Sequence, residues 1–323
     1  MQNNSKKDRN RNNKISVLIT GGGGFQGSHL AEFLISQGYK VSALNTRSKN
    51  ASMNLAMLGN QIDLIWGSVL DKKKVEDSVR NHDVVFHMAA HVNVDESLRD
   101  PGMFLRVNIL GTYNVLEAVK KYGTRLIHIS SCEVYGDGHN LKKVKGLSET
   151  TEMKPNSPYA ASKVAADRLC YSYFKSFGTN VTIVRPFNVF GERQKKGKFG
   201  ALIPILTEKA MKGESLTIFG DGSAIRDYTY IKDMIRAYNL VLRNPSLKGR
   251  EINFASGTSV SVKKITEYIA DKFGVKILYT RARPGEVSNF LPDISLAKSL
   301  GYRPKITIWE GIDRYINWAK NNK

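Results

Sequence analysis

A run of glycines directly after a short apolar segment constrains the fold of this chain more than any other feature. Residues 15–30 read Ile-Ser-Val-Leu-Ile-Thr-Gly-Gly-Gly-Gly-Phe-Gln-Gly-Ser-His-Leu. The β-branched beginning predicts a buried parallel strand, and the apolar spacing from Leu30 onward predicts a helix that stops near Gly38. A strand, a glycine turn and a helix in this order form the first unit of a dinucleotide-binding fold.

The glycines satisfy two spacings of a nucleotide-binding turn, Gly22-x-Gly24-x-x-Gly27 and Gly21-x-x-Gly24-x-x-Gly27. Glycine lets the backbone approach a pyrophosphate, and the N-terminus of the next helix offers N–H groups and a positive dipole end. Because such turns also occur without a ligand, the prediction depends on the flanking strand and helix. We predict that the residues contacting the dinucleotide here are Gly21, Gly24, Phe25, Gln26 and Gly27.

Short apolar runs and helical patterns alternate along the next part of the chain. The expected strands are 40–44, 62–65, 84–87, 125–129 and 181–184, and a later strand is expected at 251–255. The expected helices between most of them are 72–80, 103–122 and 158–177. Strands that alternate with helices predict a doubly wound parallel sheet, so the fold class is α/β with a Rossmann arrangement.

The chain divides into three predicted parts. Residues 1–14 contain almost nothing apolar after Met1 and should form a disordered basic tail. We expect a dinucleotide-binding Rossmann domain over 15–185 and a smaller, mainly substrate-binding domain over 186–323. This boundary is expected to be discontinuous, with 226–245 returning to the first domain. Ligand clefts often form at such a junction.

Composition narrows the setting and the partners. The formal net charge is +20, but Lys and Arg are spread along the whole chain without a nucleic-acid motif, so we expect no nucleic-acid partner. No apolar run is long enough to cross a bilayer, and the N-terminus is polar, so we expect no membrane association. Only Cys132 and Cys170 occur, without metal-ligand spacing, which predicts a reduced cytoplasmic setting and no metal site.

Two stretches carry candidate acid–base groups. The strand at 125–129 runs into Ser130-Ser131-Cys132-Glu133, at the edge where a doubly wound sheet presents its ligands. Further on, Tyr159 and Lys163 are four residues apart on one helix face. An ammonium beside a tyrosine favours the phenolate and lowers its pKa toward that of a useful general base. A Tyr-Lys pair alone is also common on helix surfaces.

Taken together, these stretches resemble the extended short-chain dehydrogenase/reductases, in particular the nucleotide-sugar epimerases and dehydratases. The resemblance runs from Ile15 to about Lys320. Its motifs are Thr20-Gly-Gly-Gly-Gly-Phe-Gln-Gly-Ser, His87-Met-Ala-Ala, Asn108-Ile-Leu-Gly-Thr, Ser130-Ser-Cys-Glu-Val-Tyr-Gly, Tyr159-x-x-x-Lys163, Arg185-Pro-Phe-Asn-Val-Phe-Gly, Gly222-Ser-Ala-Ile-Arg-Asp-Tyr-Thr-Tyr-Ile-Lys-Asp and Arg283-Pro-Gly-Glu.

The resemblance implies a role for each matched residue. Tyr159 would deprotonate the sugar 4-hydroxyl while a hydride leaves C4, Lys163 would hold the nicotinamide ribose and tune Tyr159, and Ser131 would bond to the same hydroxyl. Cofactor contacts would include Ala89 and Ala90. The substrate diphosphate would be gripped by Asn188, Arg226 and Arg283, in keeping with the fit of a guanidinium fork to phosphate oxygens.

Glu133 indicates the subfamily. In 4,6-dehydratases a glutamate at this position removes the C5 proton once C4 is a ketone, whereas in 4-epimerases the position is usually not acidic. Uronate decarboxylases share the pattern, so they remain an alternative, as does an idle nucleotide-binding regulator on the same fold. We expect a nucleotide-sugar 4,6-dehydratase. Cys132 stands where dehydratases carry Asp or Ser, which leaves open the group that protonates the departing hydroxyl.

The cofactor form follows from an absence of acidic residues. NAD sites normally place Asp or Glu about 20 residues after the glycines. Between Glu32 and Asp63 the chain has none, and the expected strand end carries Asn45 and Arg47 instead. Arg47 would attract a 2′-phosphate, so we expect NADP, with NAD served by Asn45 as the alternative. The apolar 103–122 helix, with the 158–177 helix, predicts a homodimer.

Overall fold

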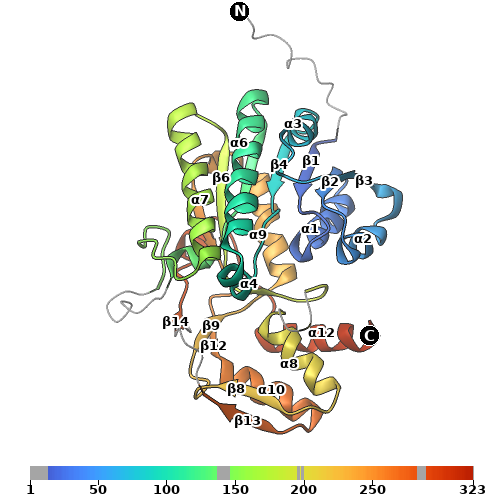
Figure 1. Ribbon diagram of the computed structural model, residues 1–323, viewed down its shortest axis with the longest axis vertical. Helices are drawn as coiled ribbons and strands as arrows, with labels where there is room; N and C mark the ends of the chain where they lie inside the picture. The colour runs from blue at the N-terminus through green and yellow to red at the C-terminus, as the bar shows by residue number, and fades with distance from the viewer. Residues whose placement is uncertain (1–13, 137–145, 195–196, 198–199, 282–288, 323) are drawn as a thin grey trace, which may run out of the picture.

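The computed structural model describes residues 14–136, 146–194, 197, 200–281 and 289–322. Residues 1–13 of the predicted basic tail lie outside these ranges, and so does Arg283. Figure 1 shows a large part, built on one sheet with helices on both faces, above a smaller part that contains the labels α8, α10 and α12.

A seven-stranded parallel sheet forms the centre of the large part, which confirms the predicted fold class. Its order is β11-β6-β5-β4-β1-β2-β3. The strands are β1 (Ser16–Thr20), β2 (Lys40–Asn45), β3 (Ile62–Trp66), β4 (Val84–His87), β5 (Arg125–Ile129), β6 (Val181–Pro186) and β11 (Glu251–Phe254).

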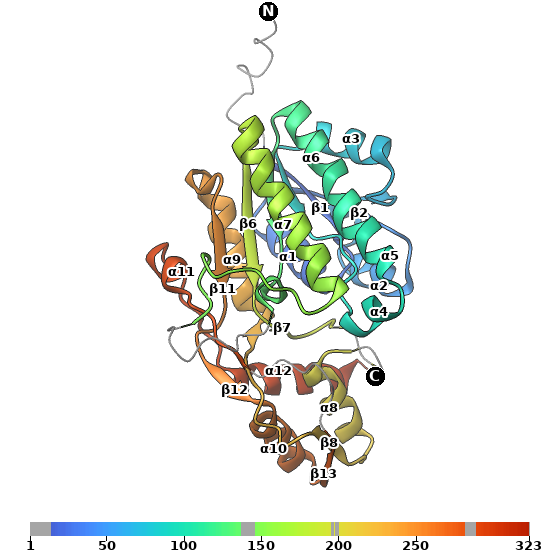
Figure 2. The same cartoon turned by 60° about the vertical axis from the view of Figure 1, so that its left-hand side comes forward.

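Helices cover both faces of this sheet. Side chains alternate across each strand, and because both sets are apolar, as in Leu18 and Ile19, both faces need cover. One face packs against α1 (Phe25–Ser36) and α9 (Ile231–Arg243). The other packs against α3 (Lys72–Arg80), α6 (Gly111–Tyr122) and α7 (Pro158–Phe177), which Figure 2 shows side by side.

Two late segments belong to the large part. Helix α9 packs on α1, within the 226–245 return expected from sequence. Strand β11 pairs in parallel with β6 and completes one edge of the sheet, a place that the apolar run at 251–255 does not by itself reveal. Helix α9 and strand β11 therefore pack with elements from the first half of the chain and with β6.

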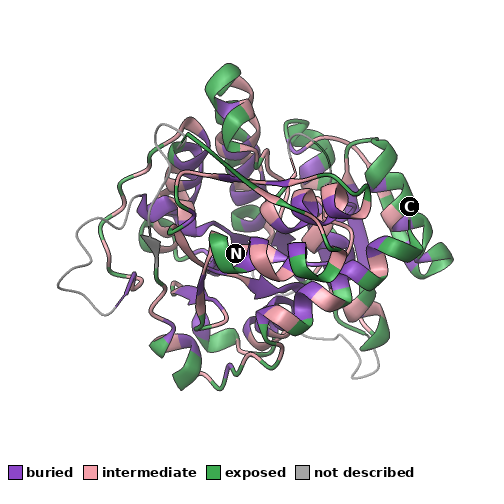
Figure 3. Ribbon diagram, turned by 90° about the horizontal axis from the view of Figure 1, so that it is seen from below, coloured by how far each residue is buried: buried purple, intermediate pink, exposed green. Residues whose placement is uncertain are grey.

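The smaller part combines short strands with three longer helices. Its ribbons are β12-β9-β14 and β13-β8, formed by β8 (Leu216–Phe219), β9 (Ile225–Asp227), β12 (Ser259–Ser261), β13 (Ile277–Thr280) and β14 (Asn289–Phe290). Its helices are α8 (Leu202–Met211), α10 (Val262–Phe273) and α12 (Ile308–Asn321). Figure 3 shows buried residues gathered toward the interior and exposed residues on the outer turns. Among the described residues, no helix is both long and apolar enough to span a membrane.

The expected helix over 103–122 is present, but it is not a regular α-helix along its whole length. The segment contains α5 (Pro101–Phe104), a π-helical segment (Leu105–Leu110) and then α6. A short helix that the sequence analysis did not expect, α4 (Val94–Arg99), precedes them. Apolar spacing is nearly the same for a regular and a locally widened helix, so the pattern could not distinguish the two.

Candidate active site

The turn after β5 places three candidate residues in succession at the carboxyl edge of the sheet. Ser131 begins a short 3₁₀ helix (Cys132–Tyr135), and its Oγ accepts the Glu133 N–H at 3.2 Å. Ser131 and Cys132 are buried, and Glu133 is partly buried. Because the serine caps the turn, the backbone of Glu133 is fixed relative to the strand.

Helix α7 brings Tyr159 and Lys163 to the same edge. Ser157 caps the helix by accepting the Ala160 N–H at 3.1 Å, and Pro158 occupies the first turn, where its missing N–H costs nothing. Lys163 is only 4% exposed, and its Nζ donates to the Ile129 carbonyl oxygen at 2.6 Å. The structure therefore brings Lys163 to the end of β5, next to the turn that carries Ser131.

Burial shifts the pKa values of both groups. Desolvation lowers the pKa of Lys163 to about 8, and the nearby carboxylate of Asp167 opposes this shift. Desolvation raises the pKa of Tyr159, while a hydrogen bond with Ser131 lowers it. With a pKa of about 8, the Lys163 ammonium still carries most of its positive charge at pH 7, although burial makes that charge costly.

Cys132 and Glu133 differ in their electrostatic surroundings. Burial raises the pKa of the Cys132 thiol to about 12, with the negative charge of Glu133 adding to the shift. The Cys132 side chain is therefore a neutral thiol that accepts the Asn188 N–H. Burial also raises the pKa of Glu133, and the positive charge of Arg226 opposes this shift. A partly desolvated carboxylate with one cation near it can act as a base in this cleft.

The glycine turn fits a dinucleotide. Gly21 has φ +73°, and a Cβ there would lie 2.8 Å from the Ala89 nitrogen, so no larger residue fits against the loop after β4. A Cβ on Gly27 would lie 2.3 Å from the Gly21 carbonyl oxygen. Helix α1 begins after Gly24 with no side-chain cap, which leaves its first N–H groups facing the turn. Ala90, the other expected contact, is half-buried in that loop.

The end of β2 carries Asn45 and Arg47 beside this turn. Asn45 Oδ1 accepts the Gly23 N–H at 3.0 Å, so this side chain shapes the turn itself. The Arg47 guanidinium lies over the Trp66 ring, 5.4 Å from its centroid, and is otherwise exposed. The indole ring therefore gives the Arg47 cation a partner beside the end of β2.

Sequence reasoning missed a buried chain of polar groups beneath the turn. His87 Nδ1 and Thr20 Oγ1 lie 2.7 Å apart, and His87 Nε2 and Thr112 Oγ1 lie 3.0 Å apart. Burial lowers the pKa of His87 to about 3, so its ring is neutral and can bridge two hydroxyl groups. Thr20 and His87 are polar residues within apolar strands, and this could have indicated a buried polar network. In the sequence analysis they served only as parts of the motifs that carry the resemblance.

Asn108, in the π-helical segment, makes hydrogen bonds to the loop after β4 and to α7. The Asn108 carboxamide accepts the His91 N–H at 2.8 Å and donates to the His91 carbonyl oxygen at 2.9 Å. It also donates to Ser162 Oγ at 2.8 Å, within the α7 turn that separates Tyr159 from Lys163. The widened helix thus links the loop after β4 to α7.

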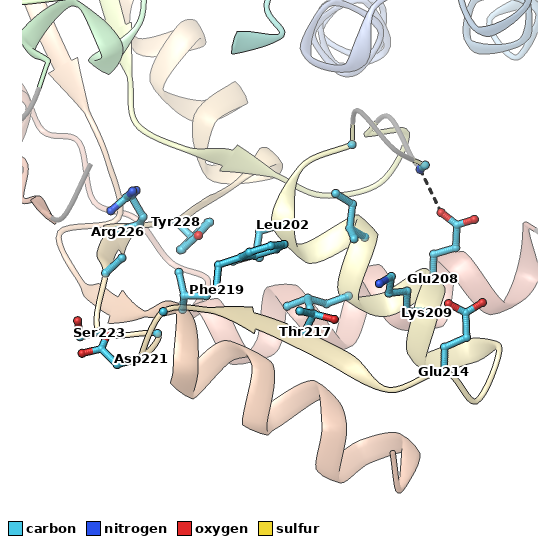
Figure 4. Close-up of a pocket in the computed structure, with 18 of the residues that line it drawn as sticks. Leu202, Glu208, Lys209, Glu214, Thr217, Phe219, Asp221, Ser223, Arg226 and Tyr228 are labelled. Carbon is cyan, nitrogen blue, oxygen red and sulfur yellow. Dashed lines mark hydrogen bonds between the residues drawn. The ribbon is translucent and has the colours of Figure 1, made fainter. Parts of the chain in front are cut away.

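A cavity of about 760 Å³ lies in the smaller part. Figure 4 shows Arg226 and Tyr228 at one end, Leu202 and Phe219 along it, and Lys209 toward the other end. Arg226 also acts electrostatically on Glu133, so this end of the cavity is close to the turn that carries Glu133. Asn188, which has φ +27°, donates from Nδ2 to the Asp227 carbonyl oxygen at 3.1 Å beside Arg226.

These features define a Rossmann fold whose glycine turn suits a dinucleotide, with a cavity in the smaller part. Residues 17–255 match the model of the NAD dependent epimerase/dehydratase family, and the chain belongs to this family. The chain is 35% identical to a putative UDP-glucose 4-epimerase from Methanocaldococcus jannaschii, over 95% of this chain and 99% of that protein. It is 31% identical to a UDP-N-acetyl-alpha-D-glucosaminuronate decarboxylase from Bacillus cytotoxicus, over 95% and 98%.

A similar solved structure belongs to a protein named for a third activity, that of a 4,6-dehydratase. The dTDP-glucose 4,6-dehydratase from Streptomyces venezuelae, solved with NAD bound, is 27% identical and superimposes with a TM-score of 0.88 over 95% of this chain and 98% of that one. Proteins named for epimerase, decarboxylase and dehydratase activities thus match this chain over nearly its whole length. The chain is a member of a nucleotide-sugar epimerase, dehydratase and decarboxylase family, and the choice among these activities depends on its own residues.

Proposed function

We propose that this protein is a nucleotide-sugar 4,6-dehydratase that uses a bound NAD(P). The observation that carries the proposal is Glu133, a partly buried carboxylate with a raised pKa on the turn next to Ser131. A 4-epimerase has no use for a base at this place, whereas elimination requires one. The 35% identity to a putative epimerase favours the 4-epimerase as the second candidate.

The glycine turn and the N-terminus of α1 would hold the pyrophosphate of the cofactor, and Lys163 would hold the nicotinamide ribose. When bound, the cofactor accepts a hydride from C4 of the sugar and returns it to C6. Tyr159 accepts the proton of the 4-hydroxyl, and Ser131 bonds to the same oxygen. We assign to the Lys163 ammonium the role of favouring the phenolate of Tyr159. The hydrogen bond with Ser131 also lowers the tyrosine pKa, against the effect of burial.

Glu133 removes the C5 proton, which the neighbouring C4 ketone makes acidic. The electron pair forms the C5–C6 double bond, and the C6 hydroxyl leaves. Because the Cys132 thiol has a pKa of about 12, it is a poor acid for this step. We assign the acid role to the newly protonated Glu133, which passes its proton to the departing hydroxyl to form water. C5 then takes a proton from solvent when the hydride adds to C6.

The nucleotide would occupy the cavity in the smaller part. Arg226 lies between this cavity and Glu133, where its guanidinium suits the diphosphate that joins nucleotide to sugar. Leu202 and Phe219 offer apolar surface to the base. Asn188 faces the same junction through its bond to Asp227. Arg283, the third expected diphosphate contact, lies outside the described residues.

The test of this function is a panel of nucleotide sugars incubated in heavy water. The expected product has lost one water and carries solvent deuterium at C5. A product isomeric with the substrate would indicate the 4-epimerase, and loss of carbon dioxide from a uronate would indicate the decarboxylase. Binding of nucleotide sugars without any turnover would indicate the regulator.

We propose that the cofactor is NADP. Replacement of Arg47 with Ala should weaken NADP binding about tenfold or more while changing NAD binding little, because only NADP carries the 2′-phosphate that the guanidinium contacts. Calorimetry on cofactor-stripped protein measures both affinities, and Lys49→Ala, at the exposed first position of the helix Lys49–Ala56, is the control. An equal loss for both cofactors would contradict the assignment.

We also propose that the protein is a homodimer formed through α6 and α7. Leu105 and Leu110 in the π-helical segment are 46% and 52% exposed, and Tyr113 on the next turn is 39% exposed. Apolar side chains clustered on one helical face support a contact with a second copy. Sedimentation should give about twice the chain mass of 36.1 kDa.

A further inference from the structure

The turn that carries Glu133 ends in a buried hydrogen-bond network that none of the roles above uses. The Tyr135 hydroxyl donates to Asn253 Oδ1 at 2.7 Å and accepts from Arg185 Nη1 at 2.9 Å. Tyr135 is 2% exposed, and the other two residues are fully buried. A single hydroxyl therefore joins the catalytic turn to β11 and β6, two adjacent strands of the large sheet.

Arg185 connects this hydroxyl to α7. Its Nε and Nη2 donate to the two carboxylate oxygens of Asp167 at 2.9 and 3.0 Å, in a forked arrangement with both side chains fully buried. Asp167 lies one helical turn after Lys163 and two turns after Tyr159, on the same side of α7. A buried ion pair adds little net stability because desolvation offsets the attraction, but its geometry is strict.

The other polar groups of the network are also paired. Arg185 Nη1 donates to the Glu149 carbonyl oxygen at 3.0 Å, and Asn253 Nδ2 donates to the Leu147 carbonyl oxygen at 2.9 Å. The Tyr135 ring stacks on Phe187, with centroids 6.2 Å apart and planes inclined by 26°. Phe187 directly precedes Asn188, so the network reaches the substrate side of the cleft as well. A fully paired buried network holds its members in one arrangement.

We propose that Tyr135 is a positioning residue that sets the Glu133 carboxylate against the C5 proton of the substrate. The turn has four residues, Ser131 fixes its beginning, and the Tyr135 hydroxyl fixes its end. Loss of the hydroxyl would let the turn rotate, and Glu133 would move away from C5 while Tyr159 and Lys163 stay on α7. This proposal rests on the proposed dehydratase function.

The test is Tyr135→Phe, which keeps the ring stacked on Phe187 and removes one oxygen. We expect kcat to fall about tenfold, because misplacement of a reacting group by a fraction of an ångström has effects of this order. KM for the sugar nucleotide should stay within about twofold. The kinetic isotope effect measured with C5-deuterated substrate should increase, because removal of that proton becomes the slow step. A merely structural role would not change this isotope effect.

Tyr173→Phe is the matched control. It also removes one buried hydroxyl from a network on α7, the one bonded to Glu117 at 2.6 Å, but at the end of the helix away from the cleft. Its isotope effect should equal that of the unmodified enzyme. Asn253→Ser is the second variant, and it should increase the isotope effect as Tyr135→Phe does. Melting curves show whether each variant is folded. The affinity for a nucleoside diphosphate without its sugar shows whether each variant still binds the nucleotide.

The outcomes separate the two proposals. If the unmodified enzyme releases no water, the dehydratase function is wrong, and the positioning role falls with it. If the enzyme does release water but the folded Tyr135→Phe and Asn253→Ser variants keep its isotope effect, the positioning role alone is overturned. A fall in kcat accompanied by an equal rise in KM and an unchanged isotope effect would also overturn it.

Discussion

Replacement of Glu133 with Gln should abolish the release of water and leave nucleotide binding nearly unchanged. Gln has the shape of Glu but cannot accept the C5 proton, so kcat for dehydration should fall about 10³-fold. Oxidation at C4 needs Tyr159 and not this carboxylate. A 4-keto sugar with an intact C6 hydroxyl should therefore accumulate, and trapping with borodeuteride followed by mass spectrometry detects it.

Glu76→Gln is the control for this experiment. The Glu76 carboxylate also accepts hydrogen bonds, from Lys121 and from the Tyr122 hydroxyl, but it lies on α3 and takes no part in the network that holds the turn of Glu133. This variant should keep most of its activity and should still label C5 with solvent deuterium. Full turnover by Glu133→Gln, or deuterium at C5 of its product, would show that another group removes the proton.

Replacement of Lys163 with Met should remove catalysis and at the same time stabilise the cofactor-free protein. Without the ammonium, the phenolate of Tyr159 is no longer favoured, and kcat should fall about 10³-fold. Burial lowers the Lys163 pKa to about 8, so at pH 7 the folded protein holds a desolvated charge that the unfolded chain exposes to water. Met fills nearly the same volume without this cost.

The pH dependence has a definite sign. A lysine whose folded pKa is depressed stabilises the protein less at low pH, and stability increases as the pH rises from about 8 toward the unfolded value of 10.5. The Lys163→Met protein should lack this rise and should be more stable at pH 7 by on the order of 3 kcal/mol. Lys120→Met, on the exposed face of α6, is the control. A lower melting temperature at pH 7 for Lys163→Met would contradict the argument.

Most of the fold could be predicted because local patterns determine it. The glycine turn, six of the seven strands of the sheet and the helix that carries Tyr159 and Lys163 each follow from apolar spacing and a few punctuating residues. Strand β11 was expected as an element, but its place beside β6 was not, because pairing between segments so far apart leaves no local pattern. The π-helical segment was not predicted either, but for a local reason. Over so short a stretch, the spacing of apolar residues is nearly the same in a widened and in a regular helix.

The candidate site could be predicted only where its residues belong to recognisable motifs. Ser131, Tyr159 and Lys163 lie close together at one edge of the sheet, but their chemical roles remain predictions. Tyr135 and Arg185 were visible in the same motifs, yet nothing in the sequence indicates that they meet each other and Asn253. Contacts of this kind depend on which strands become neighbours, and that is a property of the whole fold.

The late position of β11 in the sequence also has a consequence for the order in which the fold forms during synthesis. The turn that would hold the cofactor and the first six strands leave the ribosome well before residues 251–254, and domains generally begin to fold from the N-terminal side. Asn253, which anchors the Tyr135 hydroxyl, arrives with this last strand. On our proposals, a growing chain would thus present its dinucleotide-binding turn before Asn253 is available to fix the turn of Glu133, an order set by where β11 lies in the sequence.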